Sequence, residues 1–485
     1  MSDGSTLAKL APLEPPGPIA SEPLPRSFGV WSGVFITFAS MVGLGILTTS
    51  GYIIQETESP STLLLLWIVG ALISLCGALT FAELATLLPH AGGDYRFVSE
   101  AFGSGVGFAY GWATFLFGFA APTALAAQAV VEYLSVPVRR RLIADGSQWP
   151  NWASPVGATI IVAVLAVLHC YGRTSSRRAQ NALTLLKFVL YALFVVAGLL
   201  FGMGQWTNLL HGRSVGSQSF AALTGAMLYV FYGYSGWNAS TLVAGEISQP
   251  ARNIPRAILG GCGMVAALYL VMNLLYIFSL GPAGLQGASH NEVDAIAETS
   301  ARAMFGSRIS ESWGVFIGVS LFASLGAYLL TGSRLCYAMA RDGLFFRYAK
   351  ALSPTTLIPS AAVLTQAFAA IAFLWGSFAI AGAADAFKGL LGYTSLALIL
   401  LTDLAVLSLF MLRWQGRRSP GFAVPWYPLP PLIFIAFSAA IVIWQAISHP
   451  TGTLLSIVTV CSGWPIYLGY KRLTPSKDST PSVRR

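Results

Sequence analysis

The sequence predicts an all-α membrane protein. Of its 485 residues, 55% are hydrophobic and only 10% are charged, whereas soluble domains typically carry about 25% charged residues. Twelve apolar stretches are each long enough to cross a bilayer, which takes a helix of about 20 residues. Two of these stretches are interrupted near their centres by small and polar residues, and this feature bears most directly on function.

Reading along the chain for that length places both chain ends on the same side of the membrane. The predicted spans lie near residues 29–54, 61–88, 104–133, 153–171, 180–203, 219–246, 256–280, 312–338, 359–380, 386–412, 429–448 and 451–470. The outer loop near residues 281–311 is long enough to hold a short interfacial helix.

The segments outside this bundle, residues 1–27 and 471–485, are expected to be disordered cytoplasmic tails. The first of them is rich in proline and lacks the apolar core of a signal peptide. With the N-terminus inside, most lysines and arginines fall in the inner segments, apart from an outer cluster at residues 139–141. This asymmetry predicts that both termini of a multi-pass cell-membrane protein are cytoplasmic.

The first interrupted stretch covers about residues 30–54 and breaks at residues 41–45, Met-Val-Gly-Leu-Gly. Backbone without helical partners is costly in hydrocarbon, and it persists only where it lines a cavity or is buried in protein. Gly43 and Gly45 let the backbone turn and let a ligand approach closely.

The second interrupted stretch covers about residues 220–245 and breaks at residues 232–238. Ser235 and Gly236 are expected to form the turn, Tyr232 an aromatic lid, Trp237 a wall and Asn238 a polar contact. Two breaks at corresponding places in two halves indicate a ligand site near the bilayer midplane. The alternative is that the glycines only allow helices to pack closely.

A broken helix offers two kinds of unpaired backbone group. The free N–H groups of the second half favour a carboxylate, and the free carbonyls of the first half favour an ammonium group or a metal cation. One such site therefore presents both poles that an α-amino acid needs. The predicted substrate-binding residues are Val42, Gly43, Leu44, Gly45, Tyr232, Tyr234, Ser235, Gly236, Trp237 and Asn238.

Three of the ionisable residues within predicted spans are candidates for coupling. Lys187 is expected to face a polar partner or the cavity, although it could instead extend to the cytoplasmic interface. Glu83 and Asp403 are candidates for proton coupling, since a buried carboxyl group binds its proton more tightly. The alternative for both acids is a structural pairing with an arginine, which for Asp403 would be Arg413.

Other classes of protein find little support. The histidines and cysteines are scattered without metal-ligand or C-x-x-C spacing, so no metal, cofactor or disulfide is expected. No hydrolase, metalloprotease or phosphate-loop motif indicates an enzyme. A channel would call for a ring of like residues or a filter loop, and a nutrient sensor for longer soluble tails.

Four motifs give the chain a resemblance to a known family. In chain order they are residues 42–47 (VGLGIL), 81–84 with 92–95 (FAEL, GGDY), 234–256 (YSGWN to RNIPR) and 332–343 (GSR to ARDG). They resemble the amino acid–polyamine–organocation superfamily, close to its L-type amino acid transporter branch. The resemblance covers nearly all of residues 28–470.

The resemblance implies a LeuT-type fold with discontinuous first and sixth spans. Inverted repeats would cover about residues 28–203 and 219–413, with peripheral helices at about 429–470. It also implies amino acid transport by alternating access, as a permease or exchanger. Lys187 would stand in for a sodium ion, which makes transport sodium-independent. Ser324 is expected to pair with this position, although a buried serine can instead bond the backbone of its own helix.

One departure concerns the substrate. The family's serine in the first break is Leu44 here, which removes a hydroxyl and keeps a polyamine or other organic amine as the alternative substrate. Some L-type members bind a heavy subunit through a cysteine between spans 3 and 4. Residues 134–152 contain no cysteine, so no such covalent partner is expected. The oligomeric state and any proton coupling stay open.

Overall fold

The computed structural model describes residues 24–144, 149–210, 216, 218–286, 296–381 and 385–473. Within these ranges every regular element is a helix, and the one β-bridge, between Phe28 and Ile247, is isolated. Most of the two predicted tails lies outside the described residues. The all-α prediction is confirmed for the described part of the chain.

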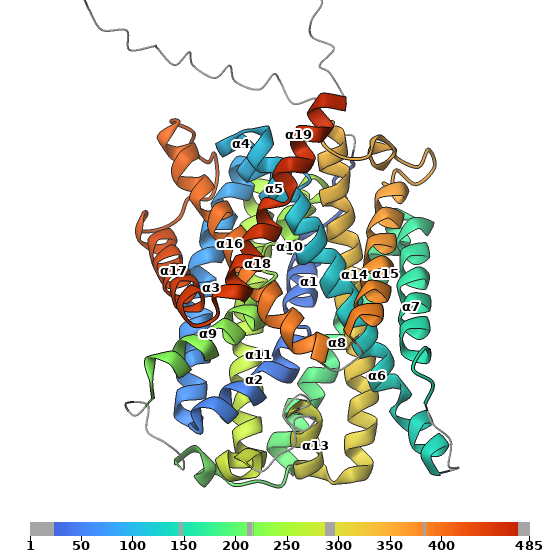
Figure 1. Cartoon of the computed structure of the whole chain (residues 1–485), viewed down its shortest axis with the longest axis vertical. Helices are drawn as coiled ribbons and strands as arrows, with labels where there is room; N and C mark the ends of the chain where they lie inside the picture. Colours follow the sequence, from blue (N-terminus) through green and yellow to red (C-terminus); the bar gives the residue numbers. More distant parts are fainter. Residues whose placement is uncertain are drawn as a thin grey trace, which may run out of the picture.

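Ten helical segments are long and apolar enough to cross a membrane, and they form the bundle in Figure 1. The helices that build them are α3 (Pro60–Leu87), α5 (Ser104–Ala113) continued by η1 (Thr114–Ala120) and α6 (Ala121–Ala144), α7 (Ala153–Tyr171), α8 (Arg173–Phe201), α11 (Pro250–Gln286), α14 (Ser307–Arg341), α15 (Ser360–Ala381), α16 (Asp385–Trp414), α17 (Leu429–Ser448), and α18 (Pro450–Cys461) continued by α19 (Gly463–Leu473).

The two interrupted stretches are broken where the sequence predicts. Helices α1 (Val30–Met41) and α2 (Leu44–Thr57) meet at an angle of 41°, and as one bent span they bring the number of spans up to 11. The second stretch forms α9 (Phe220–Tyr234) and then only the single turn of α10 (Ala239–Leu242). Because α9 is short for a span, the twelfth span stays a prediction.

Short elements cap the two ends of the bundle. Figure 1 shows α4 (Asp94–Phe102) at the end to which α19 runs, and α13 (Ile296–Phe305) at the opposite end. Helix α13 is the helix expected in the loop before α14. The remaining short turns are η2 (Trp206–Leu210), η4 (Ala244–Glu246) and η5 (Arg347–Lys350).

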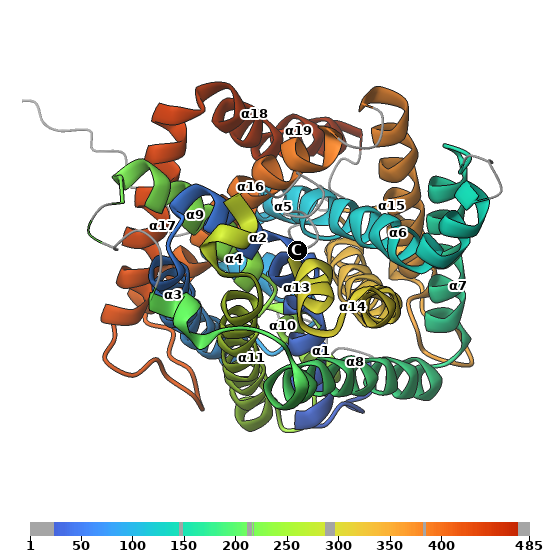
Figure 2. The ribbon, with the colours of Figure 1, turned by 90° about the horizontal axis from the view of Figure 1, so that it is seen from below.

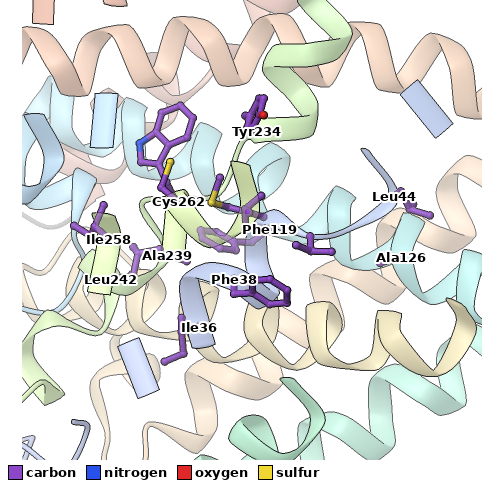
Figure 3. Packing of buried hydrophobic residues seen from close by; sticks show 14 of the residues in the cluster. Ile36, Phe38, Leu44, Phe119, Ala126, Tyr234, Ala239, Leu242, Ile258 and Cys262 are labelled. Carbon is purple, nitrogen blue, oxygen red and sulfur yellow. The ribbon is translucent and has the colours of Figure 1, made fainter. Parts of the chain in front are cut away.

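Small residues let α1 sit deep in the bundle. A side chain at Gly33 would lie 2.6 Å from Cβ of Ala257, and one at Gly261 would lie 2.6 Å from Cβ of Thr37, so α1 and α11 pack backbone to backbone. Figure 2 shows α1 and α10 inside the bundle, with α17 and α18 at its edge. Figure 3 shows Phe38, Leu44 and Phe119 among the buried apolar side chains of this interior.

Candidate functional site

The two breaks lie directly against each other. A side chain at Gly45 would come within 2.7 Å of the Gly233 Cα atom. Gly236 adopts φ +104, and a Cβ there would lie 2.9 Å from the carbonyl oxygen of Ser40. Glycine is required at these contacts because any side chain would push the two interrupted segments apart. Close packing and cavity formation are therefore both served by the same glycines.

The carbonyl groups at the end of α1 are held by side chains from three other helices. From α8, Lys187 Nζ donates to the carbonyl oxygen of Val42 and to that of Ala39, the latter at 3.3 Å. Tyr328 donates to Ser40 at 3.3 Å, and Tyr269 to Met41 at 2.7 Å. The last four carbonyls of a helix have no N–H partner within the helix. Here these side chains supply the missing hydrogen-bond donors.

Lys187 is fully buried and is not extended to the interface. Its ammonium group donates to Ser324 Oγ at 2.6 Å, and that hydroxyl lies 2.9 Å from the same Val42 oxygen. The pairing of Lys187 with Ser324 that the resemblance implies is thus present as a direct contact. The amino group of Lys187 therefore lies where the first break exposes its oxygen atoms.

The N-terminus of α2 provides the opposite pole. Its N-cap is Gly43, and no side chain caps it. The first N–H groups of the helix therefore have no protein carbonyl one turn earlier, and the dipole of a 14-residue helix favours an anion there. Helix α10 has only 4 residues, so the second break contributes little dipole.

A cavity opens beside the two breaks. It is lined by Ser40, Met41, Gly43, Leu44, Gly45, Asp94, Tyr110, Thr114, Gly118, Phe119, Pro122, Tyr232, Ser235, Gly236, Asn238, Ala239, Tyr328, Leu398, Leu401 and Thr402. Seven of the predicted substrate-binding residues are in this lining: Gly43, Leu44, Gly45, Tyr232, Ser235, Gly236 and Asn238.

The other three predicted residues lie outside the lining. Val42 is buried with its carbonyl on Lys187. Tyr234 points its hydroxyl to the Trp67 carbonyl oxygen at 3.1 Å. The ring of Trp237 packs edge-on against Phe434, with centroids 5.9 Å apart. These three residues support the cavity lining without being part of it.

Several lining residues come from helices that sequence reasoning did not connect to the breaks. Tyr110 and Thr114 lie where α5 passes into η1, and Leu401 and Thr402 belong to α16. Asp94 stands in the quoted GGDY motif, but the motif gave no indication that it faces the cavity. Helix packing, which periodicity along one segment does not report, brings these residues together.

The two candidate acids lie away from the cavity lining. Glu83 is bound by Arg413 through two hydrogen bonds of 2.8 and 2.6 Å, and it also accepts from the Val424 N–H at 2.6 Å. Asp403 accepts a hydrogen bond from Ser438 on α17. The arginine considered as a partner for Asp403 is therefore bonded to Glu83.

Neither metal nor disulfide chemistry is indicated by the described residues. In residues 24–473, apart from the gaps given above, no group of three His, Cys, Asp or Glu side chains could hold a metal ion. The cysteines in this part of the chain are free thiols. The polar groups around the breaks are instead backbone amides and carbonyls, hydroxyls, the Asn238 amide, the Asp94 carboxylate and the Lys187 amino group.

A membrane bundle with a cavity between two interrupted segments is the arrangement by which secondary transporters bind their substrates. The chain belongs to the amino acid permease family of the APC superfamily, whose profile matches residues 28–464. The family resemblance drawn from the four motifs is confirmed. The protein is a multi-pass membrane protein of a transporter family, not an enzyme family.

Three named relatives are similar to this chain over most of its length, at 25–27% identity. The chain is 27% identical to the Asc-type amino acid transporter 1 of Mus musculus over 463 residues, covering 92% of this chain and 81% of the relative. It is 25% identical to the human (Homo sapiens) b(0,+)-type amino acid transporter 1, covering 94% and 91%. It is 27% identical to the serine/threonine exchanger SteT of Bacillus subtilis (strain 168), covering 93% and 98%.

Proposed function

We propose that this protein moves amino acids across the cell membrane by alternating access, independently of sodium and as a permease or exchanger. The observation that carries the proposal is the pairing of opposite poles at the first break. The uncapped N-terminus of α2 favours the substrate carboxylate. The carbonyl oxygens of Ser40 and Met41, two residues of the cavity lining, each accept a hydrogen bond from one tyrosine and keep a second lone pair for the substrate amino group.

Sodium independence rests on Lys187. Its ammonium group already contacts the Val42 and Ala39 carbonyls and Ser324, which are the kinds of oxygen ligand that a sodium ion would use. A sodium ion could reach these oxygen atoms only by displacing the Lys187 amino group, which already occupies the position. Coupling to a sodium gradient through this locus is therefore disfavoured.

The substrate side chain would face a mixed surface. Leu44, Phe119 and Leu401 supply apolar contacts, while Ser40 and Thr114 add hydroxyl-bearing side chains to the lining. A small side chain with or without a hydroxyl suits this surface, and one relative is by name a serine/threonine exchanger. We also propose that both termini face the cytoplasm and that no cysteine-linked subunit is needed.

An organic amine or polyamine is the second candidate. It is favoured by Leu44, which offers no hydroxyl to a carboxylate, and by Asp94, whose carboxylate lines the cavity. An amine substrate would need the carbonyls and the acid but not the N-terminus of α2.

Counterflow in proteoliposomes tests the proposal. Vesicles loaded with each member of a panel of amino acids and polyamines are diluted into labelled substrate, in sodium or choline buffer and with or without a pH gradient. We expect accumulation with at least one amino acid, equal in sodium and choline. Accumulation with no amino acid, or its collapse in choline, would contradict the proposal.

A further inference from the structure

Asp94 stands at the start of α4, outside the membrane-spanning helices, and it is only 2% exposed. The turn before it brings α4 against α10: Gly92 donates its N–H to the Leu242 carbonyl at 3.2 Å, and Gly93 leaves no room for a side chain beside Thr241. Both glycines have positive φ. The Gly-Gly-Asp sequence thus docks a loop element onto the segment that follows the second break.

The carboxylate of Asp94 joins three elements. Its Oδ2 accepts hydrogen bonds from Tyr110 Oη on α5 at 3.1 Å and from the Asn238 amide at the second break. Its Oδ1 accepts from Thr241 Oγ1 on α10 at 3.0 Å. Asp94, Tyr110 and Asn238 all line the cavity. Since Asn238 turns its NH₂ group to Asp94, its amide oxygen is left as the acceptor.

We propose, on the basis of the transport function above, that Asp94 is a positioning residue. It orients the Asn238 amide for the substrate, and its protonation controls how readily the segment after the second break separates from α4 and α5. The separation would open the cavity at the end of the bundle where α4 lies (Figure 1). Asp94 would do this through Asn238 and Thr241, without binding the substrate itself.

The surroundings leave Asp94 without a neutralising charge. In the described ranges no arginine, lysine or histidine lies within ion-pair distance of its carboxylate. Of the titratable groups on the elements packed around it, Tyr110 donates to Asp94. The other charged and titratable groups are bonded elsewhere. They pair as follows: Tyr95 and Arg96 with Asp342, Glu246 with Arg334, Glu83 with Arg413, Glu100 with Arg417, and Asp403 with Ser438.

The direction of the pH effect follows from burial. Burial raises the pKa of Asp94 from 3.8 to about 6, although the hydrogen bonds from Asn238, Thr241 and Tyr110 act to lower it. A raised pKa means that protonation stabilises the closed arrangement relative to one in which water reaches the carboxylate. That stabilisation is complete below the ordinary pKa and is lost as the pH rises through about 6. Opening is therefore easier above this pH.

Hydrogen–deuterium exchange of the purified full-length protein tests the switch without any substrate. Protection factors of the amides in residues 239–246 are measured from about pH 4 to pH 8. We expect protection in the wild type to fall progressively between about pH 4 and about pH 6 and to stay level above that, and protection in Asp94→Asn to be independent of pH. The matched control is Glu100→Gln, which removes one negative charge from the same helix at the Arg417 ion pair and should behave as the wild type.

Two further variants keep the test decisive. Tyr110→Phe removes one donor that lowers the pKa of Asp94, so the fall in protection should extend to higher pH even if Asp94→Asn does not fold. Asp94→Ala frees the Asn238 amide and should raise the transport KM about tenfold or more, whereas the KM of Asp94→Asn should stay within about threefold of the wild type because its amide oxygen can still accept.

Identical pH dependence in the wild type and Asp94→Asn would overturn the switch, and an unchanged KM in Asp94→Ala would overturn the positioning role. Absence of transport in the wild type would instead refute the proposed function and leave the exchange result standing.

Discussion

At the scale of single residues, a few side chains bond the free carbonyls of the two breaks. Lys187 alone contacts two carbonyls and Ser324. Tyr269 lies within hydrogen-bonding distance of one carbonyl at each break, 2.7 Å from that of Met41 and 3.0 Å from that of Gly233. Because a buried carbonyl that loses its partner costs about 1–3 kcal/mol, each of these side chains should matter individually.

Replacing Lys187 with alanine should lower the transport rate about tenfold or more, because the carbonyls of the first break lose their shared donor. The measurement is initial uptake in proteoliposomes at equal reconstituted protein. Lys350→Ala is the control, since Lys350 is exposed on η5. Wild-type rates in a folded Lys187→Ala protein would show that the ammonium group has no part in the site.

Sequence reasoning at this scale succeeded where a residue was chemically unusual for its place. A lysine in the middle of an apolar stretch has to find oxygen atoms, and Lys187 does. It failed where a residue was ordinary for its segment. Tyr269 and Asp94 gave no signal of their own, since the partners that define their roles lie on other helices.

At the scale of elements, the site depends on two interrupted segments that pack through glycine. Their positions were predictable because small and polar residues inside an apolar run are costly unless they serve a cavity. Their lengths were not predictable. The second segment resumes as only 4 helical residues before η4 and α11, because α10 is fixed by α4 and Asp94 rather than by its own propensity.

Gly45→Ala should abolish most transport and lower thermal stability. Its methyl group would lie 2.7 Å from the Gly233 Cα atom, and backbone cannot yield as a flexible side chain can. Gly263→Ala on α11 is the matched control, because nothing lies within 4 Å of the added carbon. Uptake and melting temperature are measured for both variants. Equal behaviour of the two would mean that the breaks do not need their close contact.

At the scale of the whole molecule, one end of the bundle is tied together by ion pairs. Arg413 joins Glu83, Arg334 joins Glu246, Arg96 joins Asp342 and Arg417 joins Glu100. These pairs link α3, α4, η4, α14 and the chain around the end of α16. The overall helical class was predictable from composition, but these long-range pairings were not, since they join residues 88 to 330 positions apart.

We expect Glu83→Gln to lower stability by about 2 kcal/mol while leaving the pH profile of transport unchanged, because Glu83 is bound by Arg413 and the Val424 N–H. Thermal unfolding and uptake between pH 5 and 8 are compared with the wild type and with Asp403→Asn. A shifted pH profile in Glu83→Gln would restore this acid as a candidate proton carrier.

Competition by truncated analogues tests most directly whether the site binds both poles of an α-amino acid. For the best substrate in counterflow, the matching amine without a carboxylate and the matching acid without an amino group are added as competitors. We predict that neither competes at about a hundredfold excess, since each loses a charge-assisted set of hydrogen bonds. Competition by the amine as strong as that by the amino acid would contradict the carboxylate site at the N-terminus of α2.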